Sequence, residues 1–349
     1  MGLTIALGST PMGGDGAPSV IVRGAELART RYPGIGFMFY GEQEPISAFL
    51  DSYEKLRAVS STHHTEIVIS GEDKPSAALR KGRGSSMGLA IDAVKRGDAA
   101  GLVSAGNTGA LMAMAKLALR TLPGITRPAI ATVLPTTVSE CVMLDLGANI
   151  QCDDRNLVEF AIMGEVFART VLGLPKPSIG LLNVGEEDLK GHESIRQAAA
   201  TLREIDLPIE FHGFVEGDAV WAGVVDVVVT DGFTGNVALK TAEGIAKMYT
   251  SFMRKAYRAS LTSRLGYLLS RGALNKLRIK VDPRRYNGAM LLGLNGIVIK
   301  SHGATDAFGF ANAIGVAVDM INGGFNDLIT EEFDHLGSFG APVQKVASS

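Results

Sequence analysis

The chain has 349 residues, and its 34 Lys and Arg residues nearly balance its 36 Asp and Glu residues, giving a formal net charge of −2. This balance argues against a general nucleic-acid binder, whose affinity depends on an excess of cations. Hydrophobic residues make up 46% of the chain and charged residues 20%, which excludes a mainly disordered protein and allows a core of ordinary size.

The N-terminal sequence and the cysteine spacing both indicate the cytoplasm. The N-terminus lacks the pattern of a signal peptide, and no apolar run reaches the roughly 18 residues that a membrane span needs. The two cysteines, Cys141 and Cys152, lack a CxxC spacing, so we expect buried thiols rather than a disulfide framework or a zinc site. We therefore expect a cytoplasmic protein without a membrane span.

One unit, a strand followed by a glycine loop and a helix, recurs along the chain. Six apolar runs begin such units: 3–7, 100–104, 142–146, 178–184, 225–230 and 297–301. Apolar strands that alternate with helices predict a doubly wound, mostly parallel sheet with helices on both faces. We expect one large α/β domain over residues 1–335, with a basic amphipathic helical excursion at about 247–287 and a flexible tail at 336–349.

The first quarter of the chain lacks standard nucleotide motifs but contains one catalytic pattern. No GxGxxG follows the first strand and no GxxxxGK[ST] occurs, which disfavours a nicotinamide dehydrogenase and a Walker-type kinase. Ser86 lies in GSSMG, which matches the GxSxG nucleophile elbow of α/β hydrolases. The polar stretch before it does not read as the strand that an elbow needs. We expect a capping or anion-contacting hydroxyl, and a serine thioesterase using Ser86 stays an alternative.

The loop after the strand 100–104 contains Gly106, Asn107 and Thr108 and leads into a helix through Leu119. Loops at the carboxyl ends of parallel strands line one crevice, into which helix N-termini direct their amides. Glycine lets the backbone approach an anion, and Asn and Thr add neutral donors. We therefore predict a phosphate site in this crevice, although each glycine could also serve only a turn or a cap. Its predicted residues are Gly106, Asn107, Thr108, Thr234, Gly235 and Asn236.

Two ionisable residues follow later strands of the same pattern. Lys190 lies in VGEEDLKGHE between a strand and a helix, where a cation could face an oxyanion; the neighbouring acids could tether it or only solvate the loop. His302 directly follows the strand 297–301 and begins a glycine loop, which would place it in the predicted crevice; a hydrogen-bonded structural histidine at a strand end is the alternative. Lys300 and Lys240 also lie near glycine loops, and Lys240 is expected at the surface. The six histidines show no metal-binding spacing, so we expect neither a metal nor a cofactor.

A basic segment interrupts the alternation between residues 254 and 285. It contains ten Lys and Arg residues and one acid, Asp282. Leu261, Leu265 and Leu268 lie at helical spacing on one face. Such a helix can lie on an anionic membrane surface or dock an acidic protein, and a packing helix at a dimer interface is the alternative.

Seven strings of the sequence resemble those of the bacterial phosphate acyltransferases, and they occur in order over roughly residues 3 to 330. They are MGGDGAP (12–18), SAGNTGALM (104–112), RPAI with LPT (127–136), LDLGAN (144–149), GLLNVGEEDLKGHE (180–193), DVVVTDGFTGNVALKTAEG (226–244) and VIKSHGATD (298–306). The chain departs from the family at its first loop, where residues 8–11 precede MGGD in place of a family motif with an additional acid.

The resemblance implies a homodimeric αβα enzyme with a fold like that of phosphate acetyltransferases and the isocitrate dehydrogenase group. Family members transfer a fatty acyl group from an acyl carrier protein thioester to inorganic phosphate, and the acyl phosphate enters phospholipid synthesis. The resemblance also implies docking of an acidic carrier protein and peripheral contact with the inner face of the membrane, here through about 254–285. Lys190 matches a family lysine that is regarded as catalytic.

Our mechanistic hypothesis is direct attack by bound phosphate on the thioester carbonyl, because phosphate is already a nucleophile at neutral pH and mainly needs positioning. Lys190 would stabilise the oxyanion and His302 would protonate the leaving thiolate. A short-chain phosphate acyltransferase that uses acyl coenzyme A, and a noncatalytic membrane adaptor, are further alternatives.

Overall fold

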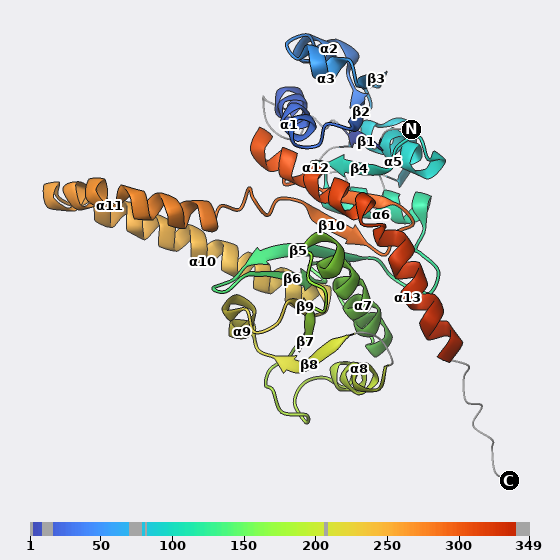
Figure 1. Ribbon diagram of the computed structural model, residues 1–349, viewed down its shortest axis with the longest axis vertical. Helices are drawn as coiled ribbons and strands as arrows, with labels where there is room; N and C mark the ends of the chain where they lie inside the picture. The colour runs from blue at the N-terminus through green and yellow to red at the C-terminus, as the bar shows by residue number, and fades with distance from the viewer. Residues whose placement is uncertain (1–2, 9–16, 70–78, 81, 206–208, 340–349) are drawn as a thin grey trace.

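The computed structural model describes residues 3–8, 17–69, 79–80, 82–205 and 209–339. Within these ranges the strands form one 11-stranded sheet in the order β3-β2-β1-β4-β11-β10-β5-β6-β9-β7-β8 (Figure 1). The strands are β1 (Leu3–Gly8), β2 (Ile35–Gly41), β3 (Ser60–His64), β4 (Gly101–Ser104), β5 (Ala129–Pro135), β6 (Glu140–Leu144), β7 (Ser178–Leu182), β8 (Glu210–Val215), β9 (Val227–Val229), β10 (Ala289–Leu292) and β11 (Ile297–Lys300).

Helices cover both faces of this sheet, as the sequence predicts. Side chains alternate between the faces along each strand: Leu7 packs with α1 and α12 on one face, whereas Ala6 packs with α5 and α6 on the other. The helices are α1 (Ala17–Arg31), α2 (Gln43–Leu50), α3 (Glu54–Arg57), the short 3₁₀ helix η1 (Gly82–Gly84), α5 (Ser86–Arg96), α6 (Thr108–Leu119), α7 (Asp154–Val171), α8 (Glu193–Glu204), α9 (Gly217–Ala222), α10 (Gly232–Arg258), α11 (Leu261–Lys280), α12 (Ala307–Asn322) and α13 (Phe325–Phe339).

The sheet reverses direction in its middle, so loops from two halves of the sheet with opposite strand directions meet where the sequence predicts a crevice. Strand β10 is antiparallel to both β11 and β5, and β5 is antiparallel to β6. Ile299, Met290, Ala131 and Leu144 therefore lie at one level, from which β11 and β6 continue in opposite directions. Two groups of loops result. The loops after β4 and β11 leave the end of one half of the sheet, which we call the β11 edge, and those after β6, β7 and β9 leave the end of the other half, the β6 edge. The register places the strand ends of the two halves at about the same level.

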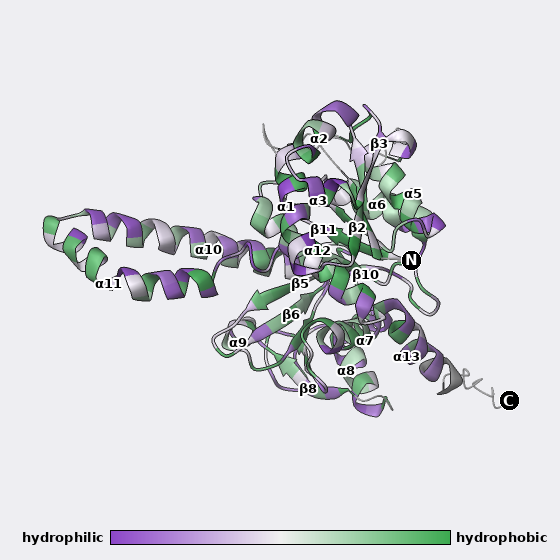
Figure 2. Ribbon diagram, turned by 45° about the horizontal axis from the view of Figure 1, so that its top comes forward, coloured by the Kyte–Doolittle hydropathy of each residue, from purple (hydrophilic) through white to green (hydrophobic). Residues whose placement is uncertain are grey.

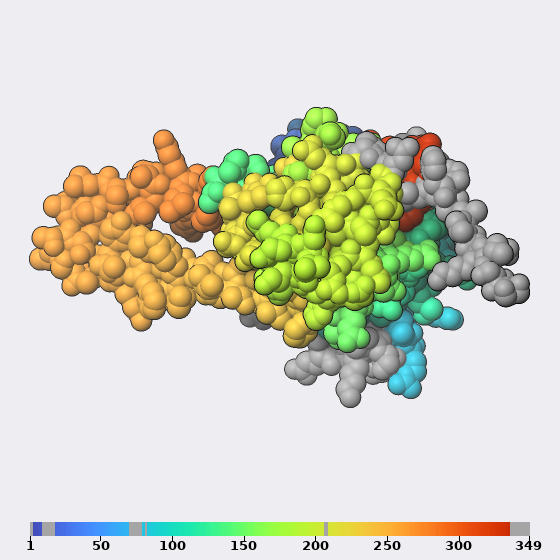
Figure 3. Space-filling view, turned by 90° about the horizontal axis from the view of Figure 1, so that it is seen from below, coloured from blue at the N-terminus to red at the C-terminus, as the bar shows by residue number. Residues whose placement is uncertain are grey.

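The basic segment belongs to a long helical hairpin of α10 and α11, which we call the arm. Figure 1 and the space-filling view of Figure 3 show it projecting from the body of the molecule. The helical part begins at Gly232, well before the excursion predicted at 247, and α11 contains no buried residue. Figure 2 shows apolar and polar residues intermixed along both arm helices.

The C-terminal end differs from the predicted tail. Helix α13 continues to Phe339, so residues 336–339 are helical. The rest of the predicted tail, 340–349, lies outside the described residues. None of the helices in the described part of the chain is long and apolar enough to cross a membrane.

Candidate active site

The β11 edge brings the loop after β4 beside the end of β11. Lys300 pairs in register with Ser104, and the backbone of Ser104 accepts a hydrogen bond at 2.9 Å from the amide of the residue after Lys300. The Gly106 amide donates to Ser104 Oγ at 3.2 Å, which shapes the turn. Asn107 caps α6 by accepting from the Ala110 amide at 2.9 Å. Gly106, Asn107 and Thr108 therefore lie where the sequence predicts them, at a helix N-terminus beside a strand end.

His302 lies at the same edge and is held by its neighbours. Its amide donates to Asn287 Oδ1 at 2.9 Å, and its ring Nδ1 accepts from the Ala304 amide at 3.1 Å. Buried Asn287 also donates to Ser301 Oγ and to the Gly309 carbonyl, both at 2.8 Å. Because Nδ1 acts as an acceptor, the neutral ring carries its proton on Nε2. Asn287 is therefore a positioning residue that no motif in the sequence indicated.

The charges around His302 favour its neutral form. Burial lowers the pKa of His302, repulsion from Lys300, Lys240 and Lys247 lowers it further, and Glu243 acts in the opposite direction. Lys240 forms an exposed ion pair with Glu243 at 3.1 Å, in agreement with its predicted surface position. The middle turns of α10 thus face the His302 loop.

A salt bridge connects the end of the arm to this loop. Arg284, between α11 and β10, contacts Asp306 at 2.7 Å and also pairs with Asp282. Asp306 caps α12 by accepting from the Gly309 amide at 3.0 Å, and hydrogen bonding to Gly309 and Arg284 contributes to lowering its carboxyl pKa. The α12 N-terminus is therefore held from two sides. Arg284 contacts it through Asp306, and Asn287 contacts it through the Gly309 carbonyl.

The β6 edge is organised around a buried carboxylate, Asp145. It is fully buried and accepts five hydrogen bonds of 2.7–3.2 Å, from the amides of Ile130, Gly147, Ala148 and Asn149 and from the Asn149 side chain. Burial raises the pKa of Asp145, and these hydrogen bonds oppose that rise. This network ties the end of β6 to the start of β5.

The second half of the predicted phosphate site, Thr234 to Asn236, begins α10 at the β6 edge. Asp231 caps the helix and occupies both the amide and the hydroxyl of Thr234, at 2.9 and 2.7 Å. The Gly235 amide donates to the Asp231 carbonyl at 2.9 Å. A Cβ on Gly235 would lie 2.0 Å from the Asp145 carbonyl oxygen, so close packing explains this glycine. The structure places this segment at the β6 edge and Gly106–Thr108 at the β11 edge, and phosphate binding by both segments stays a prediction.

Lys190 lies in the exposed loop after β7, also at the β6 edge. Its amide donates to the Glu187 carbonyl at 3.0 Å, and its carbonyl accepts from Asn183 Nδ2 at 3.1 Å. Asp188 pairs with Arg203 at 2.6 Å, so this acid is engaged elsewhere in the loop. A catalytic role for Lys190 stays a prediction.

Ser86 lies in a different setting from a nucleophile elbow. It begins α5 after the 3₁₀ helix η1 rather than after a strand, and its side chain is fully buried. Ser85, not Ser86, caps α5, because its Oγ accepts from the Gly88 amide at 3.1 Å. Ser85 therefore fills the capping role expected of Ser86, and contact of the Ser86 hydroxyl with an anion stays a prediction.

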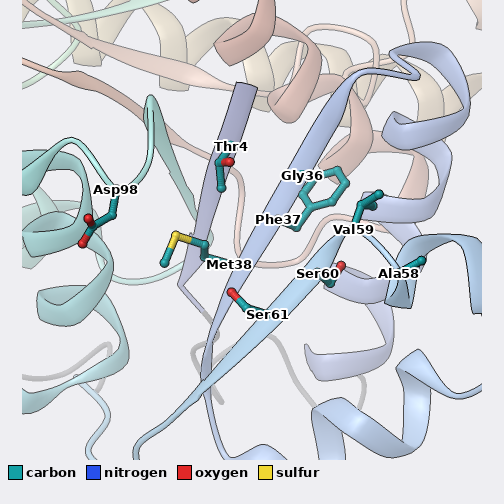
Figure 4. Close-up of a pocket in the computed structure, with 9 residues that line it drawn as sticks. All are labelled: Thr4, Gly36, Phe37, Met38, Ala58, Val59, Ser60, Ser61 and Asp98. Carbon is teal, nitrogen blue, oxygen red and sulfur yellow. The ribbon is translucent and has the colours of Figure 1, made fainter. Parts of the chain in front are cut away.

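Two cavities lie away from His302. One, of about 660 Å³, lies at the β6 edge, and burial raises the pKa of its Cys152 thiol to about 12, which keeps the thiol protonated at neutral pH. The other, of about 310 Å³, lies where β1, β2 and β3 begin (Figure 4). Figure 4 labels Asp98 as the one ionisable residue of that lining, so this groove lacks a catalytic grouping.

The fold is that of the phosphotransacylases. A phosphotransacetylase from Streptococcus pyogenes superimposes with a TM-score of 0.62 at 18% identity, over 92% of this chain and 94% of that one. A phosphotransacetylase from Staphylococcus aureus gives 0.59 at 14% identity, over 92% and 94% of the two chains. The mixed sheet with helices on both faces thus defines an α/β fold of this architecture.

Comparison of sequences identifies the family more specifically than comparison of folds does. Residues 4–328 match the model of a family described as fatty acid synthesis protein, and the chain belongs to that family. A relative from Paramagnetospirillum magneticum is 57% identical over 96% of each chain, and one from Rhodospirillum centenum is 61% identical over 93% of this chain and 92% of its own. Both are named phosphate acyltransferase. The resemblance noted in the sequence is confirmed, and the chain is an acyltransferase.

Proposed function

We propose that this enzyme transfers a fatty acyl group from an acyl carrier protein thioester to inorganic phosphate, giving acyl phosphate for phospholipid synthesis. The observation that carries the proposal is the match of nearly the whole chain to relatives named phosphate acyltransferase. The β11 edge supports it further, because Gly106, Asn107 and Thr108 lie there beside a lysine and a histidine.

The reaction needs one displacement at the carbonyl carbon. A phosphate oxygen attacks the thioester carbonyl, a tetrahedral oxyanion forms, and the carbon–sulfur bond breaks to release the carrier thiolate. His302 in its neutral form offers Nε2–H as a hydrogen-bond donor to the oxyanion or to the sulfur. Full proton transfer from His302 is less important, because its lowered pKa leaves few protonated rings at neutral pH. Lys190 would have to approach the reacting atoms from the β6 edge.

The basic arm favours a protein donor over a small thioester. Ten Lys and Arg residues against one acid between 254 and 285 give this segment a charge that complements an acidic carrier protein. Acyl coenzyme A is the alternative donor. A carrier-protein donor predicts that kcat/KM falls steeply with added salt, because long-range attraction between unlike surfaces is screened.

One assay tests the reaction and its alternatives. The full chain is incubated with long-chain acyl carrier protein, with or without phosphate, and acyl phosphate is trapped with hydroxylamine. We expect trapped product only with phosphate, and a much lower rate with short-chain acyl coenzyme A. Thiol release without phosphate that is lost in Ser86→Ala would instead identify a thioesterase, and no turnover would leave the noncatalytic adaptor.

We also propose that the arm joins two copies of the chain. Ile245, Met248 and Phe252 lie at helical spacing on α10 and are 51–58% exposed, a row of apolar side chains that a second copy would cover. Phe252→Asp is expected to shift the mass in solution from dimer to monomer. Thr250→Asp, on another side of the same helix, is the matched control and should remain dimeric.

Peripheral membrane contact would use the other arm helix. Leu261, Leu265 and Leu268 are 58–81% exposed and are flanked by basic residues of the 254–285 segment. Such a surface binds anionic bilayers through both apolar burial and charge. We expect the full chain to sediment with vesicles containing anionic lipid and not with neutral ones, and Leu265→Ser with Leu268→Ser to weaken the binding. Equal binding to neutral vesicles would contradict an electrostatic contribution.

A further inference from the structure

Lys300, the last residue of β11, is a partly buried lysine whose ammonium faces backbone carbonyls. Its ammonium contacts the backbone carbonyls of Ala105, at 3.4 Å, and Ser301. An ammonium has three N–H donors, and among the described residues only these two carbonyls accept from it. No carboxylate of the described part of the chain forms an ion pair with it. Burying a cation without an opposite charge costs free energy, so we expect Lys300 to meet an anion that offsets this cost.

Lys240 provides a comparison, because a carboxylate neutralises its charge. Lys240 also faces His302, but Glu243 neutralises it at 3.1 Å. Repulsion from Lys300 lowers the pKa of His302, which places the ammonium near that ring. The contact with Ala105 places it equally beside the loop that contains Gly106 and Asn107. Lys300 thus lies between the two segments that the proposed reaction uses.

We infer that the Lys300 ammonium binds the inorganic phosphate substrate at the β11 edge, supplying the positive charge of that subsite. This inference rests on the proposed function, because it assigns a residue to the phosphate of that reaction. The phosphate dianion supplies the opposite charge that the partly buried ammonium lacks and an acceptor for its third N–H. The two carbonyls orient the ammonium before phosphate arrives.

The test uses the full chain, inorganic phosphate and the variant Lys300→Gln, whose amide can still donate to the two carbonyls but carries no charge. Losing one charged hydrogen bond to the ligand is expected to raise KM for phosphate about 10- to 100-fold, with KM for the acyl donor within about twofold. Lys116→Met, an exposed lysine near the other end of α6, is the matched control and should match the unaltered chain.

A binding measurement separates this inference from the proposed function. Phosphate that binds the folded chain raises its melting temperature. We expect that rise in the unaltered chain and in Lys116→Met and its loss in Lys300→Gln, whether or not acyl phosphate is formed. A folded Lys300→Gln that keeps the rise and a normal KM for phosphate would overturn the inference while leaving the reaction intact.

A second measurement needs no variant. Burial lowers the pKa of Lys300 to about 8, so the affinity of the unaltered chain for phosphate should fall as pH rises through 8 and the ammonium loses its proton. The neighbouring His302 is already neutral in this pH range because its pKa is lowered. The other charged groups that act on His302, namely Lys240, Lys247 and Glu243, lie on α10. An affinity that stays constant from pH 7 to pH 9.5 would exclude Lys300 as the binding cation.

Discussion

The two edges of the sheet have similar loop sequences but opposite electrostatics. Both carry Gly, Asn and Thr after a buried strand, and each has a capping aspartate. The β6 edge, however, holds a buried carboxylate with five donors, whereas the β11 edge holds a partly buried ammonium without a carboxylate partner among the described residues. Anions are attracted to the second arrangement and repelled by the first. Glycine loops therefore indicate close backbone packing at both edges, whereas the fixed charges differ between the edges; phosphate binding by Thr234 to Asn236 stays a prediction.

The largest effect should come from removing the carboxylate of the β6 edge. Asp145→Ala leaves five buried donors without their acceptor, and we expect unfolding free energy to fall by about 3–5 kcal/mol, as when one partner of a buried charged network is removed. Urea denaturation measures this loss. If Asp145 instead bound substrate, the variant would keep its stability and lose activity.

The next prediction tests whether glycine at this edge serves packing. Gly235→Ala places a Cβ 2.0 Å from the Asp145 carbonyl oxygen, and the shift it forces should cost about 1–3 kcal/mol of unfolding free energy. The control is Gly244→Ala in the same helix, where the Cβ meets nothing within 4 Å. That change should stabilise the chain by about 0.5–1 kcal/mol. Equal effects of the two substitutions would contradict the packing explanation.

The β11 edge is tested at His302. If its Nε2–H acts as a neutral donor, His302→Ala should lower kcat about tenfold, the usual size for one neutral hydrogen bond, and His302→Gln should recover part of it by supplying an amide donor. Single-turnover rates with saturating phosphate measure this. A glutamine variant as slow as the alanine variant would point to proton transfer instead.

The local elements could be predicted from the sequence, but the arrangement of the edges could not. The strand expected at 297–301 is Ile297–Lys300, and the helix after Asn107 ends at Leu119 as predicted, because both follow from local apolar patterns. The reversal at β10 depends on its pairing with β5, far away in the chain, and no local pattern reports it. Asn287 is similar: its contact with His302 exists only after β10 and β11 have paired.

The smallest effect concerns the charges on α10 that face His302, and its sign is informative. Lys247 repels the imidazolium and Glu243 attracts it, so Lys247→Met should raise the pKa of His302 and Glu243→Gln should lower it further. With six histidines in the chain, NMR titration can follow the His302 ring separately. Shifts of opposite sign would locate the middle of α10 beside His302 in solution. Because α10 continues into the arm, they would also show that charges on the arm helix act on the β11 edge. Unchanged titration in both variants would mean that the helix lies farther from the ring than the structure places it.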